Sequence, residues 1–192
     1  MRPRFISLAG ASVLALFSLT TPGLAAGDTL ALSIGAYDVG AIGSVEDRAV
    51  TFGAEYRSHY ALLWRIKPMV GALGNSDGSF YGYGGFYVDF NLGDLISGAV
   101  AKRIFITPSA AVGGYVQGDS NKDLGDAVEF RTGVEVTYRM DYGGRIGVAF
   151  HHISNAGLGS NSGKSGPGQS SNPGTEIVSA VYVLPLDKIF GK

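Results

Sequence analysis

The feature that most constrains the fold is a two-residue alternation in segments about ten residues long. In AVEFRTGVEVTYRM, residues 127–140, the alternate positions from Phe130 to Met140 hold apolar residues, with one threonine among them. The positions between them carry a glycine, a threonine and charges of both signs. Because successive strand side chains point to opposite faces, the segment predicts a β-strand with one apolar and one polar face. VTFGAEYR and LALSIGAYD repeat the scheme.

A soluble β-sandwich also alternates, with its apolar face inward. Two features favour the inverse arrangement, in which the apolar face points outward. The segments have the length that a tilted strand needs to cross a bilayer, and the polar faces combine glycine, tyrosine and paired charges, which suits a narrow barrel interior. Closure also leaves no open sheet edge in lipid. The sequence therefore predicts an all-β fold, an eight-stranded antiparallel transmembrane β-barrel, with strands at 29–39, 48–57, 60–73, 79–90, 103–115, 127–140, 145–154 and 174–186.

The connections between these strands differ in length. Turn-forming residues occupy GNSDGS at 74–79, GDSNKDLGD at 118–126 and DYGG at 141–144. The stretch NLGDLISGAVAKR is longer, and we expect it to hold a helical turn. GLGSNSGKSGPGQSSNPG, at 157–174, is expected to be a flexible loop.

The N-terminus predicts export from the cytoplasm. MRPR supplies positive charge, an apolar run of about fifteen residues follows, and TTPGLAA provides small residues for cleavage after Ala25 or Ala26. A short membrane anchor is the alternative, but the run is shorter than the ~20 residues of a spanning helix. We therefore expect a cleaved signal peptide at 1–26 and a single barrel domain at 27–192.

Composition excludes several function classes. Only 16% of the residues are charged and the net charge is −1, so no basic surface indicates nucleic-acid binding. Cysteine is absent, which excludes disulfides and thiol catalysis. The sequence has no metal-ligand spacing and no phosphate-binding loop, and no cofactor is expected.

The alternation of side chains along the strands places three polar residues on the outward face, which is otherwise apolar. Bacterial barrels keep their short turns in the periplasm, so strand 145–154 should end at the cell surface. His152 and Ser154 share the outward face of that strand with apolar residues, and Glu176 occupies the outward face of the next strand. The neighbouring His151 should face the lumen and pair with Glu129 or Glu135.

A serine, a histidine and a carboxylate are the components of an acyl-transfer site, because a weak hydroxyl nucleophile needs a base and an oriented imidazole. The alternative is that these residues merely lie in the lipid headgroup zone, where polar groups cost little. On the residues alone, both interpretations stay open.

The sequence also resembles a known family. HHISNAG followed by NPGTE resembles the C-terminal signature of PagL, the outer-membrane lipid A 3-O-deacylase, and the strands GYGGFYVDF, LGDAVEFRTGVEVTYR and RIGVAFHHISNAG are similar to those of the family. The resemblance covers most of the chain after residue 26 and is strongest over 125–182.

The resemblance implies an eight-stranded barrel with a Ser-His-Glu site on its outer surface. Ser154 would then be the nucleophile, His152 the base and Glu176 the third member, with candidate oxyanion-hole groups at Asn155, Ala156 and Gly157. The chain departs from the pattern by an apparent insertion, GSNSGKSGPGQSS, and by a tail that ends in Gly-Lys.

The leading hypothesis is therefore a multi-pass outer-membrane barrel that acts as a serine esterase on the lipid A of lipopolysaccharide, in contact with outer-membrane lipids. One rival is a structural or adhesive barrel without chemistry. Another is an acyltransferase or phospholipase on the same scaffold. The sequence allows a homodimer without specifying one.

Overall fold

A computed structural model describes residues 27–41, 45–158 and 174–190. The expected signal peptide at 1–26, most of the loop expected at 157–174 and the last two residues lie outside these ranges. The elements, in chain order, are β1 (Thr29–Tyr37), β2 (Val50–Arg57), β3 (Lys67–Asn75), β4 (Phe80–Tyr87), β5 (Phe90–Asn91), the 3-10 helices η1 (Leu92–Asp94) and η2 (Ala101–Arg103), β6 (Ile104–Val116), β7 (Val128–Arg139), β8 (Arg145–Ser154), β9 (Gly174–Pro185) and α1 (Leu186–Phe190).

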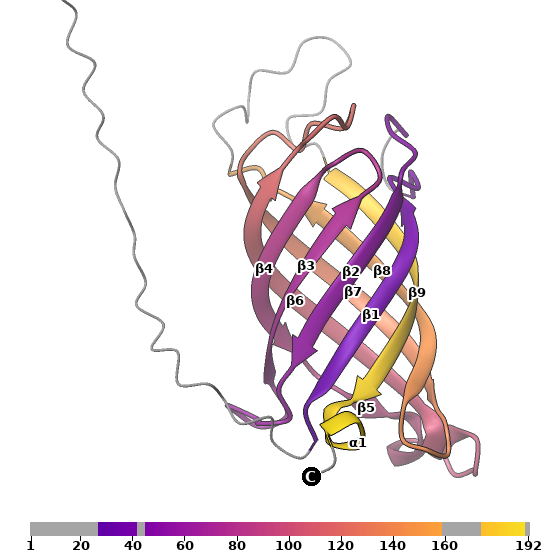
Figure 1. Cartoon of the computed structure of the whole chain (residues 1–192). Coiled ribbons are helices and arrows are strands. Elements are labelled where there is room, and N and C mark those ends of the chain that lie inside the picture. Colours follow the sequence, from indigo (N-terminus) through magenta and orange to yellow (C-terminus); the bar gives the residue numbers. More distant parts are fainter. Residues whose placement is uncertain (1–26, 42–44, 159–173, 191–192) are drawn as a thin grey trace, which may run out of the picture.

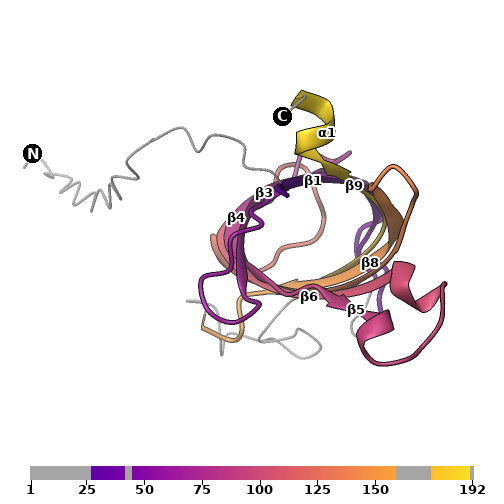
Figure 2. The same ribbon diagram turned by 90° about the horizontal axis from the view of Figure 1, so that it is seen from below.

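The long strands form a closed antiparallel barrel (Figures 1 and 2). The strands pair in the order β4-β3-β2-β1-β9-β8-β7-β6, in which the first and last strands of the chain, β1 and β9, lie side by side. Pairing of β4 with β6 closes the ring. The two-residue β5 only extends the sheet beside β6. The predicted all-β, eight-stranded antiparallel barrel is thus confirmed.

One predicted strand boundary is wrong. The third strand was expected to begin at residue 60, directly after a tight turn, but β3 begins at Lys67. Residues 58–66 instead form an irregular connection with an isolated bridge between Leu63 and Ile66. Trp64 adopts a φ of 53° there, which interrupts regular strand geometry. The helical turn expected in NLGDLISGAVAKR is confirmed as η1 and η2.

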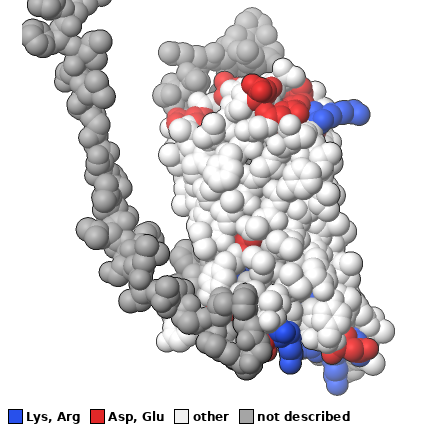
Figure 3. All heavy atoms as spheres, in the orientation of Figure 1, with Lys and Arg blue, Asp and Glu red and all other residues white. Residues whose placement is uncertain are grey.

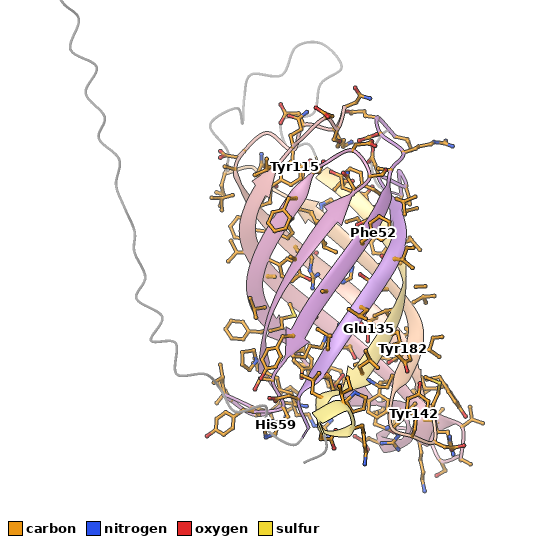
Figure 4. The ribbon with its side chains drawn as sticks, viewed as in Figure 1. Phe52, His59, Tyr115, Glu135, Tyr142 and Tyr182 are labelled. Carbon is orange, nitrogen blue, oxygen red and sulfur yellow. The ribbon has the colours of Figure 1, made fainter. Side chains whose placement is uncertain are left out.

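The two ends of the barrel differ. We call the end that carries residues 27 and 190 the terminal end. The opposite end, with residues 38–41, 45–49, 76–79, 117–127 and 155–158, is the loop end. At the terminal end the buried carboxylate of Asp28 accepts hydrogen bonds from the Tyr56 hydroxyl at 2.6 Å and from the His59 backbone N–H at 2.9 Å (His59 is labelled in Figure 4). This contact fixes the start of β1.

The outer surface of the barrel wall is apolar. Outward positions such as Ile34, Phe52 and Val148 are more than half exposed, and Figure 3 shows a nearly uncharged belt between two charged rims. Lipid-exposed barrels present such a belt to hydrocarbon. Separately, no helix among the described residues has the length and apolarity to span a membrane.

The lumen is filled by charged and aromatic side chains. Arg57 forms a bidentate ion pair with Glu135 of the opposite strand β7, with nitrogen–oxygen distances of 3.1 and 2.8 Å. Glu55 bonds both Arg57, at 2.7 Å, and Arg131, at 2.6 Å. Figure 4 shows Glu135 inside the ring. These contacts connect β2 to β7 across the lumen and brace the wall from within.

Candidate active site

The parity of β8 decides which of its two histidines can meet lipid. Along this strand Ile146 and Val148 are exposed, and His152 follows them on the same face with 29% of its side chain exposed. His151 points into the lumen, where it lines a small cavity with Arg131 and Glu55. The predicted orientation of both histidines is confirmed.

The predicted partner of His151 is wrong. Within the described ranges its ring makes no hydrogen bond or ion pair with Glu129 or Glu135. Its ring instead occupies the space opposite Gly133, where a β-carbon would overlap the imidazole. Both carboxylate oxygens of Glu129 are buried without a hydrogen-bond partner among the described residues, and the carboxylate of Glu135 pairs with Arg57.

His152 and Glu176 form a hydrogen-bonded pair. They are direct cross-strand partners of β8 and β9, and Nδ1 of His152 lies 3.0 Å from Oε1 of Glu176. Glu176 is 1% exposed, so its carboxylate is shielded from solvent although strand parity directs it outward. A carboxylate that accepts from Nδ1–H fixes the tautomer of the ring and leaves Nε2 free to accept a proton.

The ring of His152 lies over Gly174. A β-carbon at Gly174 would be 2.7 Å from Cε1 and 3.2 Å from Nε2 of this imidazole. Gly174 is the direct cross-strand partner of Ser154. The ring therefore extends from Glu176, which Nδ1 contacts, toward Gly174 and hence toward the cross-strand pair of Gly174 and Ser154.

Ser154 is the last residue of β8 and is 8% exposed. It shares the outward face with His152, two residues earlier, so their α-carbons lie about 7 Å apart along the strand. Within the described ranges its hydroxyl makes no hydrogen bond. Catalytic hydrogen bonds are often long before substrate binds, so this spacing is compatible with a nucleophile and its base.

The three residues expected to supply oxyanion donors have different surroundings. The side-chain amide of Asn155 donates to the Leu124 carbonyl at 3.2 Å, and its oxygen accepts from Gly157 N–H at 2.9 Å. Ala156 adopts a left-handed φ of 54° and is exposed. Its N–H makes no hydrogen bond in the part of the chain that the structure describes. Of Ala156 and Gly157, only Ala156 therefore has a backbone N–H without an acceptor among the described residues.

Polar contacts around Asp38 at the loop end, which we call the frame, hold the site in place. Asp38, buried at the end of β1, accepts from Glu46 N–H at 2.7 Å and Asp47 N–H at 3.1 Å, and its carboxylate lies 3.4 Å from Lys122 Nζ. The Thr175 hydroxyl also lies 3.4 Å from this carboxylate. The frame joins the connections 38–49 and 117–127 to the strand of Glu176.

Sequence reasoning missed Gly174, Asp38 and Leu124 as parts of this site. Gly174 was visible only as part of the NPGTE motif, and nothing in the sequence indicated that its missing side chain makes room for a ring. Asp38 and Leu124 act through long-range contacts that no local pattern signals. No cluster of histidine, cysteine and acidic residues suited to a metal ion occurs among the described residues.

The fold and the site define a class: an eight-stranded barrel with an apolar outer wall and an outward histidine–glutamate pair next to a serine. Comparison with protein families identifies a particular one. The family model of PagL, lipid A 3-O-deacylase, matches residues 50–165, more than half of the chain, and the chain belongs to this family. Membership implies a lipid A 3-O-deacylase of the outer membrane. The match includes His152 and Ser154 but ends before Glu176.

Solved structures share the fold at low sequence identity. The crystal structure of the outer membrane enzyme PagL is 18% identical, with a TM-score of 0.52 over 82% of this chain and 99% of that chain. Neisserial surface protein A (NspA) is 9% identical, with a TM-score of 0.50 over 82% of this chain and 96% of that one. A comparison with curated protein sequences finds no significant match.

Proposed function

We propose that the chain is an outer-membrane serine esterase that removes the 3-O-linked hydroxyacyl chain from lipid A. Ser154 is the nucleophile, His152 the general base and Glu176 the residue that orients the imidazole. The observation that carries the proposal is the 3.0 Å contact between His152 and Glu176, on the same outward face as Ser154. Family membership supplies the substrate class.

In the first half of the reaction, the Ser154 hydroxyl attacks the ester carbonyl at the 3-position of the sugar. Its proton passes to Nε2 of His152, and Glu176 stabilises the resulting imidazolium. The N–H of Ala156 is the donor we assign to the developing oxyanion. The bond between the acyl carbon and the sugar oxygen then breaks, and the imidazolium gives its proton to that oxygen, which leaves as the sugar 3-hydroxyl.

In the second half, water attacks the acyl-enzyme ester. His152 accepts one proton from this water, Ser154 is released as the leaving group and regains a proton, and a 3-hydroxy fatty acid departs. An outward site permits this chemistry while the remaining acyl chains stay in the membrane. Neighbouring apolar side chains on the same face, such as Phe130 of β7 and Val178 of β9, give these chains an apolar surface.

Mass spectrometry of lipid A tests the proposal. Cells that express the chain should contain lipid A that has lost one hydroxyacyl group, and cells with an empty vector should not. Gain of an acyl chain would indicate an acyltransferase. An unchanged spectrum from a correctly folded barrel would support a structural or adhesive role instead.

The proposed orientation predicts that the loop end is at the cell surface. Cysteine is absent from the natural chain, so a single introduced cysteine reports on one position. Asp119→Cys, exposed at the loop end, should react with an impermeant maleimide in intact cells, whereas Asp141→Cys, exposed at the terminal end, should react only after lysis. The reverse pattern would place the site in the periplasmic leaflet.

A small substitution at Gly174 should disturb the base without disrupting the barrel. In Gly174→Ala the new methyl group would lie 2.7 Å from Cε1 of His152, so the ring must move. Because displacements of about 1 Å can cost about 10²-fold in rate, we expect a fall in kcat of that order. Gly84→Ala is the matched control, since its β-carbon would meet nothing closer than 3.9 Å. Equal activity of both variants would contradict the placement of His152 over Gly174.

A further inference from the structure

A groove opens at the loop end of β1 and β2. It has a volume of about 460 Å³, within the range of small-ligand sites. Ala36 of β1 and Val50 of β2 contribute one wall, and Val39 and Val45 of the connection 38–49 contribute another. Two charged residues, Asp38 and Arg48, also line the groove. Asp38 is buried with its carboxylate 3.4 Å from Lys122 Nζ, so Arg48 brings the exposed charge to an otherwise mainly apolar lining.

The groove begins one strand away from the proposed triad. The N–H of Val39 donates to the backbone carbonyl of Glu176 at 3.0 Å, and Ala36 is the cross-strand partner of Val178 on β9. Ala36 and Val50 belong to the outward, exposed set of their strands, as His152 does on β8. A molecule at Ser154 could therefore extend over β9 into this groove along the outer surface.

Hydrogen bonds hold the backbone of the lining residues in place. The N–H of Tyr37 donates to the Ala49 carbonyl at 2.9 Å, which closes the base of the connection. The carboxylate of Asp38 holds the backbone N–H groups of Glu46 and Asp47. These bonds hold the backbone on both sides of Arg48, at Asp47 and Ala49, without help from a ligand.

Arg48 has an unusual electrostatic position. It is exposed, and within the described ranges its guanidinium makes no hydrogen bond or ion pair. The other cation of the described loop end, Lys122, is buried against Asp38 and Glu46. Among the residues of these connections that the structure describes, the other exposed charges are acidic, as the mainly red upper rim of Figure 3 shows. An anion that approaches this rim therefore finds one available cationic partner among the described residues.

We propose that this groove is a subsite for the lipid A substrate, in which a neighbouring acyl chain lies against Ala36 and Val50 while Arg48 binds a phosphate of the sugar backbone. The subsite rests on the proposed function for its substrate. The chemistry fits because guanidinium groups bind phosphate through two parallel hydrogen bonds, and apolar walls accept an acyl chain. The subsite positions the sugar so that its 3-position meets Ser154.

Binding and turnover test the subsite separately. In a Ser154→Ala barrel, which binds without turnover, the affinity for bisphosphorylated lipid A is measured by native mass spectrometry. Arg48→Ala should lower this affinity about tenfold, the value of one charge-assisted contact, and Arg48→Glu should lower it further. Arg65→Ala, an exposed arginine at the terminal end, is the control and should leave affinity unchanged. Dephosphorylated lipid A should bind equally to the Arg48 variants and their parent.

A second variant tests the apolar part of the groove. Ala36→Phe should fill it and weaken binding of both phosphorylated and dephosphorylated lipid A, whereas Ala54→Phe, exposed on the outward face farther along β2, should not. A heat-shift gel confirms folding of every variant.

The outcomes separate the subsite from the reaction. Unchanged lipid A affinity in both Arg48 variants would overturn the subsite, even if the wild-type barrel deacylates lipid A. Equal Arg48 dependence for phosphatidylglycerol would also overturn it, because the site would then be a general anion contact. If the wild-type chain binds lipid A in an Arg48-dependent manner but leaves it intact, the subsite stands and the proposed deacylation fails.

Discussion

Replacing Ser154 or His152 by alanine should reduce lipid A deacylation by at least about 10³-fold, because nucleophile and base act as a unit and losing either removes the covalent route. The double variant should be hardly worse than each single one. Hydrolysis of lipid A by the refolded barrel, followed by mass spectrometry, measures the loss. A heat-shift gel shows whether the barrel is intact, which we expect because both side chains lie on the outer face.

His151→Ala is the internal control for this result. It is adjacent in sequence and removes the same imidazole, but its side chain faces the lumen beside Arg131 and Glu55. We expect it to keep most of the activity. An inactive His151 variant beside an active His152 variant would move the chemistry into the lumen and exclude a substrate held in the outer leaflet.

The deacylation activity of Glu176→Ala should lie between that of the wild type and that of His152→Ala. The substitution removes the partner 3.0 Å from Nδ1 but leaves the base and the nucleophile in place. Glu176→Gln is a sharper version, because it preserves shape while changing an acceptor-only group into one that can also donate. Activity of Glu176→Gln at the wild-type level would remove Glu176 from the triad.

The two-residue alternation in the sequence predicted the barrel because successive side chains of each strand must point in turn to lipid and to the lumen. This alternation is a local pattern, as around Phe130, so it could be recognised without knowledge of contacts between distant residues. Parity alone also assigned His151 to the lumen and His152 to the outer face. The cross-strand register then explains why His152 meets Glu176, 24 positions later, across an intervening loop.

Features that depend on long-range contacts could not be predicted in this way. The partner of Asn155 is a carbonyl of another connection, at Leu124, and no spacing in the sequence indicates that hydrogen bond. The late start of β3 depends on the irregular backbone near Trp64. The burial of Glu176 depends on neighbours that parity does not specify, so a residue expected to meet lipid is 1% exposed.

The second large effect concerns stability. Glu55→Leu should lower the free energy of unfolding by about 3–5 kcal/mol, because it leaves the guanidinium of Arg131 buried without a carboxylate partner. Arg57 is less affected, since it keeps its bidentate pair with Glu135. Urea titration of the barrel refolded into lipid vesicles, followed by the single tryptophan, measures the change. Asp94→Ala is the comparison: it breaks an exposed pair with Arg65 and should cost at most about 1 kcal/mol.

The double variant Glu55→Leu/Arg131→Leu decides whether an uncompensated charge causes this loss. Removing both partners of a buried ion pair is often nearly neutral, so the double variant should recover much of the stability that Glu55→Leu loses. Arg131 is the cross-strand partner of Ile153, between His152 and Ser154. Loosening β7 at this position should therefore reduce deacylation in Glu55→Leu, and the double variant should restore part of it. A double variant less stable than the single would show that these side chains stabilise the lumen mainly by packing, and that charge pairing does not brace the strand of the active site.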